Sequence, residues 1–302
     1  MFELFQTIGS WSVTIFVVTS MLNVGFTQKP SRLLLHLSNR AFLLLNFIVV
    51  PALMITATDL VELDPIDEAG LLVFALAAGA PFLIKLTATS DSDIALGTTV
   101  MLVLIVATVP VLPIVLPWVL EGQAVDTGAI VSGLLTQMIL PLLIGMLSAQ
   151  FTARVVAVVQ PWAARISNVA LYVLIVAIVI GYLPAMGDPG LWKAIAVGVA
   201  VLVLALFLGW TMGDGHDDLQ DVGGLGTAQR GTAAALIVAQ GTFDDPGALV
   251  VITLVNTFGV VLLVFAAKLM SRENSVDFLI PEAADPPPVP ARRTRGPDDR
   301  EH

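Results

Sequence analysis

The sequence of 302 residues contains no cysteine, and only 13% of its residues are charged. Without cysteine there are no disulfides and no thiolate metal sites. Histidine is scarce too, because His36, His216 and His302 are the three copies and all fall in expected loops or at the C-terminal end. A nucleophile–base pair or metal set of the kind an intramembrane enzyme needs is therefore not visible. We expect a protein that is not an enzyme.

Apolar residues are abundant instead, at 57% of the chain with a mean hydropathy of +0.90. Soluble domains are about half apolar and about a quarter charged. Runs of about twenty apolar residues, each able to cross a bilayer as a helix, recur along the chain. We predict an all-α integral membrane protein whose transmembrane domain is residues 1–270. Its nine expected spans are 5–26, 40–58, 69–89, 94–119, 129–151, 165–185, 191–213, 222–241 and 246–269.

Basic residues gather in alternate loops. Most lie after the first span, between the fifth and sixth spans, or near the C-terminal end: Lys29, Arg32, Arg40, Arg154, Arg165, Lys268 and the arginines from Arg272 onward. The intervening loops are acidic, with Lys193 as the basic exception. Since short basic loops stay cytoplasmic, we expect a multi-pass protein of the cell (plasma) membrane with its N-terminus outside and its C-terminus inside. The net charge of −10 argues against nucleic-acid binding.

The composition changes near residue 271. Residues 271–302 are rich in proline and charge, as in PEAADPPPVPARRTRGPDDREH. Such a segment cannot bury enough apolar surface to offset the entropy of ordering it. We predict a disordered cytoplasmic tail over 271–302.

Two basic residues remain inside expected spans, Lys85 in the third and Arg230 in the eighth. Both spans contain residues that interrupt helices: Gly79 and Pro81 in the third, Gly226 and Gly231 in the eighth. Interrupted helices in two matching spans indicate a transporter site, because a broken helix frees backbone carbonyls and amides near the bilayer midplane. The alternative is that these glycines only allow close helix packing.

Several short motifs resemble those of one family, in order along residues 5–270. They are GFTQKP at 25–30, LLLNFIVVPAL at 43–53, SDSDIALGTT at 90–99, ILPLLIGML at 139–147, GTAQRGTAAALIVA at 226–239 and VNTFG at 255–259. Together they resemble the bile acid:sodium symporter family of secondary transporters. In this likeness Asn46 stands at a glutamine position, and Pro51 and Asp93 match family residues.

The resemblance implies inverted repeats of five helices, the first helix of the first repeat being absent here, arranged as a panel domain and a core domain. The third and eighth spans would be two broken helices that cross in the core. Family members bind two sodium ions there, through Ser and Asn on one crossing helix and Glu and Gln on the other. At the matching positions this chain has Leu83 to Lys85 and Leu225, while Gln229 is retained and is followed by Arg230. Most oxygen ligands of a hard cation are thus missing, and no metal site is expected.

A charge count leads to the same region. An ionised lysine or arginine at the bilayer centre costs about 2.5–3.5 kcal/mol. Something negative must offset Lys85 and Arg230, and Asp93 is expected to cap the following helix instead. The candidates are backbone carbonyls at half-helix C-termini, which would make both side chains tethered substitutes for sodium, and an anionic substrate. In a third interpretation both side chains extend to the membrane interface.

We therefore expect a secondary transporter that moves a small organic anion by alternating access, without two-sodium coupling and without a cofactor. Lys85 and Arg230 form the expected charge centre. The expected polar supports, each also explicable as an ordinary interhelical hydrogen-bonding group, are Asn46, Thr87, Gln229 and Asn256. A sodium-coupled organic anion symporter, a channel and a membrane receptor without transport remain alternatives.

Overall fold

The computed structural model describes residues 2–27, 40–120, 126–181, 183, 185–243 and 245–271. Within these residues the chain is helical apart from turns and short extended stretches, and the only strand-like pairing is one isolated antiparallel β-bridge. A helix satisfies its backbone hydrogen bonds within the segment, as a bilayer requires. The prediction of an all-α integral membrane protein is confirmed. The predicted tail lies outside the described residues except for Ser271.

Seven helical runs in the described chain are long and apolar enough to cross a membrane. They are α1 (Phe2–Thr27), α2 (Arg40–Leu44) with α3 (Val50–Val61), α6 (Ile94–Val119), α7 (Thr127–Gly133) with α8 (Leu140–Phe151), α9 (Ala153–Gly181), α10 (Pro189–Thr211) and α13 (Gly247–Met270). Short π-helical turns, Leu45–Val49 and Leu134–Ile139, join the halves of the two composite runs. A 3-10 turn, Ala185–Gly187, precedes α10.

The third and eighth predicted spans are broken helices. The third is α4 (Pro65–Leu76) followed by α5 (Leu83–Thr89), and the eighth is α11 (Asp217–Ala228) followed by α12 (Thr232–Thr242). The predicted interruptions are therefore confirmed. Predicted ends were less accurate: α9 begins at Ala153, before the expected start at residue 165.

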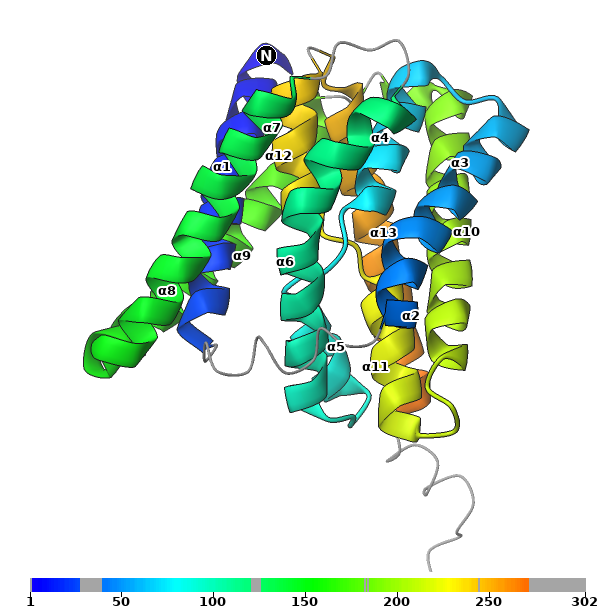
Figure 1. Cartoon of the computed structure of the whole chain (residues 1–302). Coiled ribbons are helices and arrows are strands. Elements are labelled where there is room, and N and C mark those ends of the chain that lie inside the picture. Colours follow the sequence, from blue (N-terminus) through cyan, green and yellow to red (C-terminus); the bar gives the residue numbers. More distant parts are fainter. Residues whose placement is uncertain are drawn as a thin grey trace, which may run out of the picture.

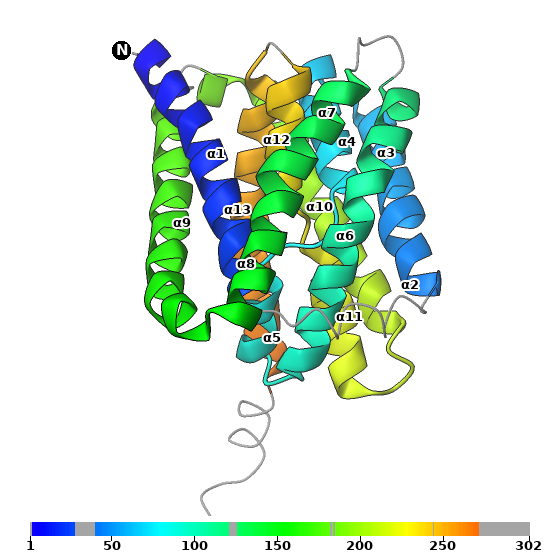
Figure 2. The same cartoon turned by 60° about the vertical axis from the view of Figure 1, so that its left-hand side comes forward.

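The helices form two groups. In the first, α1, α8 and α9 pack against each other along one side of the bundle (Figure 2). A Cβ atom at Gly145 of α8 would lie 2.5 Å from the carbonyl oxygen of Leu22, so the approach of α1 to α8 requires glycine. The second group contains α3, α4, α6, α10, α11 and α13, and α12 contacts the first group through α1 and the second through α4 and α13. This division matches the panel and core that the resemblance implies.

Two opposite faces of the bundle carry the helix ends. The N-terminal face contains the starts of α1, α4, α10 and α13, whereas the C-terminal face contains the starts of α2 and α9 and the end of α13 (Figure 1). Large apolar side chains are exposed around the outside, among them Trp11 at 68% and Phe151 at 75%. An exposed apolar girdle of this kind is expected where lipid surrounds the protein.

Candidate charge site at the crossing of the broken helices

Two short stretches cross in the interior of the bundle, residues 77–82 between α4 and α5 and residues 229–231 between α11 and α12 (Figure 1). Ala78 and Arg230 form the antiparallel bridge, and the Gly231 amide donates to the Ala77 carbonyl at 2.8 Å. Backbone groups that lost their helical partners are thus paired with each other, which removes a large desolvation cost.

Glycine is required at two points of the crossing. Gly79 has φ +79°, a left-handed conformation, and a Cβ atom there would lie 2.7 Å from the Ile105 amide nitrogen. A Cβ atom at Gly231 would lie 2.8 Å from the Gly79 carbonyl oxygen. Pro81 lies in the turn that leads to α5. These three residues occupy the breaks, as predicted from the sequence.

Gly226 does not belong to a break, which corrects one prediction. It lies within α11, which continues to Ala228. A Cβ atom at Gly226 would lie 3.0 Å from the Val100 side chain, and one at Gly223 would lie 2.7 Å from the Gly209 carbonyl oxygen. The glycines of α11 therefore serve close packing against α6 and α10, the alternative that the sequence left open.

Thr108 of α6 fixes the first break, and nothing in the sequence singled it out. Its hydroxyl donates to the Ala78 carbonyl at 2.8 Å and accepts from the Ala78 amide at 3.0 Å. Thr108 is fully buried. One hydroxyl therefore satisfies both the donor and the acceptor of the residue that bridges to Arg230.

The Arg230 guanidinium is enclosed by oxygen atoms. Nη1 donates to Asn46 Oδ1 and to the Thr227 carbonyl, both at 3.1 Å. Nη2 donates to the Asn46 carbonyl at 3.0 Å and to the Ala75 carbonyl. Arg230 is only 1% exposed, and its buried Nε has no partner among the described residues. Four of its five N–H groups thus have acceptors, which is what a buried guanidinium requires.

Helix ends supply the negative potential around Arg230. Ala75 is in the last turn of α4 and Thr227 is in the last turn of α11. The carbonyl end of a helix carries roughly half a negative charge, and two such ends converge on one guanidinium. The charge is therefore offset without a carboxylate.

Asn46 reaches Arg230 because the helix around it is π-helical. The Val50 amide donates to the Leu45 carbonyl, five residues earlier, and Pro51 has no amide hydrogen. The Asn46 carbonyl therefore has no helical donor and accepts from Arg230 instead. The Asn46 side-chain amide nitrogen donates to the Phe42 carbonyl and to the Thr227 hydroxyl, at 3.1 and 3.3 Å.

Lys85 lies in a different environment, which corrects the prediction that it is buried. Leu83, Leu86 and Thr87 of α5 are buried, whereas Lys85 is exposed. Its Nζ lies 5.7 Å from the centre of the Phe82 ring, within cation–π range. Residues two apart on a helix point in different directions, so a packed Leu83–Thr87 face turns Lys85 outward.

The other predicted supports are distributed around the crossing. Thr87 donates to the Leu83 carbonyl within its own helix, at 2.9 Å. Asn256 of α13 accepts from the Thr232 hydroxyl at 2.6 Å, at the start of α12. Gln229 is buried, and its Oε1 has no partner in the described chain. The Gln229 side-chain nitrogen donates to the Arg230 carbonyl at 3.5 Å. Of the four supports, Asn46 alone has a side-chain hydrogen bond to the Arg230 guanidinium within the described chain.

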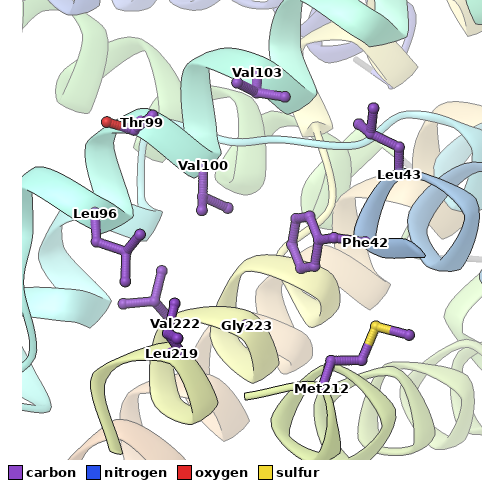
Figure 3. A pocket seen from close by; sticks show the side chains of 11 residues that line it. Phe42, Leu43, Leu96, Thr99, Val100, Val103, Met212, Leu219, Val222 and Gly223 are labelled. Carbon is purple, nitrogen blue, oxygen red and sulfur yellow. The ribbon is translucent and has the colours of Figure 1, made fainter. Parts of the chain in front are cut away.

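An apolar cavity of about 200 Å³ lies beside the crossing (Figure 3). Its walls come from α2, α6, α10 and α11 and include Phe42, Val100, Met212 and Leu219. Thr99 supplies the one polar side chain of the lining, and no charged residue contributes. Val100 of this lining also packs against Gly226 in the last part of α11, four residues before Arg230. This cavity can take apolar groups but offers no charge to an anion.

Acidic side chains near the breaks have other roles. Asp93 Oδ1 accepts from the Ala95 and Leu96 amides at 2.7 and 3.3 Å, which confirms the predicted cap. Asp221, which is buried, accepts from the Ser92 hydroxyl at 3.1 Å. Among the described residues no group of three His, Asp or Glu side chains is placed to hold a metal ion. The oxygens around Arg230 do not fit a sodium ion while the guanidinium faces them.

A helical membrane bundle with two broken helices that cross at a buried charge has the architecture of a secondary transporter. The sequence matches the sodium bile acid symporter family over residues 14–186, more than half of the chain. The protein therefore belongs to this family, whose members are transporters. A search of curated proteins found no match to this chain.

Proposed function

We propose that this protein transports a small organic anion across the membrane by alternating access, without coupling to sodium. Family membership supports the transporter class and an organic anion of the bile acid type as the solute. The observation that carries the cation independence is the guanidinium of Arg230 among four oxygen acceptors. A protein-borne cation that faces these oxygens excludes a second cation by repulsion.

Lys85 is the cation that remains available to a solute. It is exposed on α5, next to the break, whereas the N–H groups of Arg230 are directed at protein oxygens. An ammonium group with free donors can bind a carboxylate or sulfonate. We therefore assign solute binding to Lys85 and a fixed charge to Arg230.

The test is uptake of labelled anions into proteoliposomes, with a bile acid and a short monocarboxylate as probes. Uptake is expected to be unchanged when potassium or choline replaces sodium at fixed pH. Lys85→Ala should lose uptake, whereas Lys193→Ala, which removes an exposed lysine of α10, should retain it. Strong stimulation of the unaltered protein by a sodium gradient would overturn the proposal.

Sodium-coupled transport of the same anion is the second candidate, because the family to which the chain belongs is named for it. It requires that sodium bind outside the oxygens that Arg230 uses. The orphaned Oε1 of Gln229 is one buried acceptor near the crossing. A sodium-dependent uptake that Gln229→Leu abolishes would favour this candidate.

A further inference from the structure

Three helices begin close together on the N-terminal face, and a buried carboxylate lies among them. Asp67 is in the first turn of α4, before the apolar run that starts at Ala69. It is 7% exposed. No hydrogen bond to its carboxylate is found within the described chain, although the carboxylate oxygens are not among the fully buried atoms that lack a partner. Such a group is unusual because buried carboxylates are normally paired or hydrogen-bonded.

The charged groups that face Asp67 are all acidic. Asp64 precedes α4, Asp188 precedes α10 and Asp245 lies before α13. Two of these carboxylates accept hydrogen bonds from amides at helix N-termini. Asp188 accepts from the Gly190 amide of α10 at 2.9 Å, and Asp245 accepts from the Gly247 amide of α13 at 2.8 Å. Ionised Asp67 therefore repels the caps of α10 and α13 as well as Asp64.

Other elements packed on α4 bring no compensating charge. The helices α6 and α12 contain no titratable residue. On the α3 side, Glu68 accepts from Thr58, and Asp59 and Glu62 are exposed. Lys193, the basic residue of α10, is exposed and a full turn beyond Asp188. The start of the α4 helix favours an anion only by about 0.3–1 kcal/mol.

We propose that Asp67 is a proton-binding site at the place where α4, α10 and α13 begin. With the proton bound, Asp67 carries no charge and gains one O–H donor among three carboxylates. Without the proton, four like charges adjoin, one of them buried. The ligand is a proton and not a metal ion, because the described acidic residues form no metal-binding group. The site is independent of the transported solute.

The pH range follows from the environment of this carboxyl group. Burial, then Asp64, Asp188 and Asp245, raise the pKa of Asp67 from 3.8 to about 6. In the unfolded chain the pKa is the lower value, so the folded protein holds the proton more tightly. The stabilisation is therefore fully present below about 4 and is lost as the pH rises through about 6.

The test is thermal unfolding of the purified full-length protein in detergent, between pH 7.5 and pH 5. Intrinsic fluorescence of the five tryptophans is the signal, since thiol-reactive dyes find no cysteine. The unaltered protein should gain a few degrees or more in melting temperature at the lower pH. Asp67→Asn should melt at pH 7.5 as the unaltered protein does at pH 5. The rise in melting temperature that the unaltered protein shows between pH 7.5 and pH 5 should therefore be smaller in this variant by the contribution of Asp67.

Two further variants keep the result decisive. Asp64→Asn removes one neighbouring charge without removing a cap, since the Asp64 side chain makes no cap hydrogen bond, and should move the midpoint of the transition to lower pH. Asp59→Asn, at an exposed position of α3, should leave the midpoint unchanged. The proposal is overturned if Asp67→Asn retains the full pH response or is less stable than the unaltered protein at pH 7.5. It is also overturned if Asp64→Asn leaves the midpoint in place.

Discussion

Arg230 is stable in the interior because its surroundings are built from main-chain oxygens whose helical partners are missing. The Ala75 and Thr227 carbonyls are free because α4 and α11 end there, and the Asn46 carbonyl is free because of the π-helical turn and Pro51. Three unrelated helix interruptions thus supply acceptors to one side chain. These acceptors offset much of the desolvation cost of the buried charge, and removal of one partner is expensive.

Arg230→Ala is expected to lower the melting temperature markedly. The substitution leaves the surrounding oxygens without donors, and each unpaired buried acceptor costs about 1–3 kcal/mol. Oxygens that face one small space also resemble the ligand set of a hard cation. Millimolar guanidinium or sodium ions should therefore restore part of the lost stability in this variant, as measured by thermal unfolding, and should not affect the unaltered protein.

The matched control is Arg165→Ala. Arg165 is exposed on α9, where its guanidinium lies 5.6 Å from the centre of the Trp162 ring. Its removal should change stability little and should create no salt response. If Arg230→Ala melts like the unaltered protein, or if the ions act equally on all three proteins, the oxygens do not form a cation site.

The crossing of two broken helices depends on a third, intact helix. Thr108 lies within α6, whose backbone is continuous, and its hydroxyl holds both polar groups of Ala78. Gly79, the next residue along the chain, lies against Leu104 and Ile105 of the same helix. Contacts with α6 therefore fix the position of the first break, and this position sets where Ala78 pairs with Arg230.

Thr108→Val should destabilise the protein by about 2–4 kcal/mol. Valine has nearly the same shape but no hydroxyl, so the Ala78 amide and carbonyl would lose their partner in a buried site. Thr108→Ser keeps the hydroxyl and should cost about 1 kcal/mol for the lost methyl group. Thermal unfolding of the two variants side by side measures the difference, and equal melting temperatures would contradict the assigned role of the hydroxyl.

Which parts of the crossing the sequence could predict depends on how local each signal is. Gly79 and Pro81 disfavour helix by their own backbone properties, so the first break was visible without a structure. Gly226 was misassigned because a glycine that permits packing and one that breaks a helix look alike in sequence. Lys85 was misplaced because an apolar run fixes a helix but not its rotation. Thr108 was missed because its partner, Ala78, is thirty residues away and has no distinguishing side chain.

At the scale of the whole molecule, most of the described basic residues lie on one of the two faces. Described basic residues of the loop ends, including Arg40, Arg154 and Lys268, belong to helix ends on the C-terminal face (Figure 1). The acidic residues around Asp67 lie on the N-terminal face. The C-terminal face carries carboxylates as well, because the residue before α6 and the first turn of α11 are acidic. The two faces therefore differ in their basic residues, and these give the orientation in the membrane a physical basis.

We expect the C-terminal face to be cytoplasmic and the N-terminal face, with the Asp67 site, to be external. The reason is that lysine and arginine in short loops are retained on the cytoplasmic side, whereas aspartate and glutamate have little effect on insertion. A phosphatase reporter, active only outside the cytoplasm, and a fluorescent reporter, active only inside, can be fused separately after His302. Fluorescence without phosphatase activity is the expected result. The opposite result would invert the orientation, and Asp67 would then respond to the pH of the cytoplasm and not to that of the surroundings.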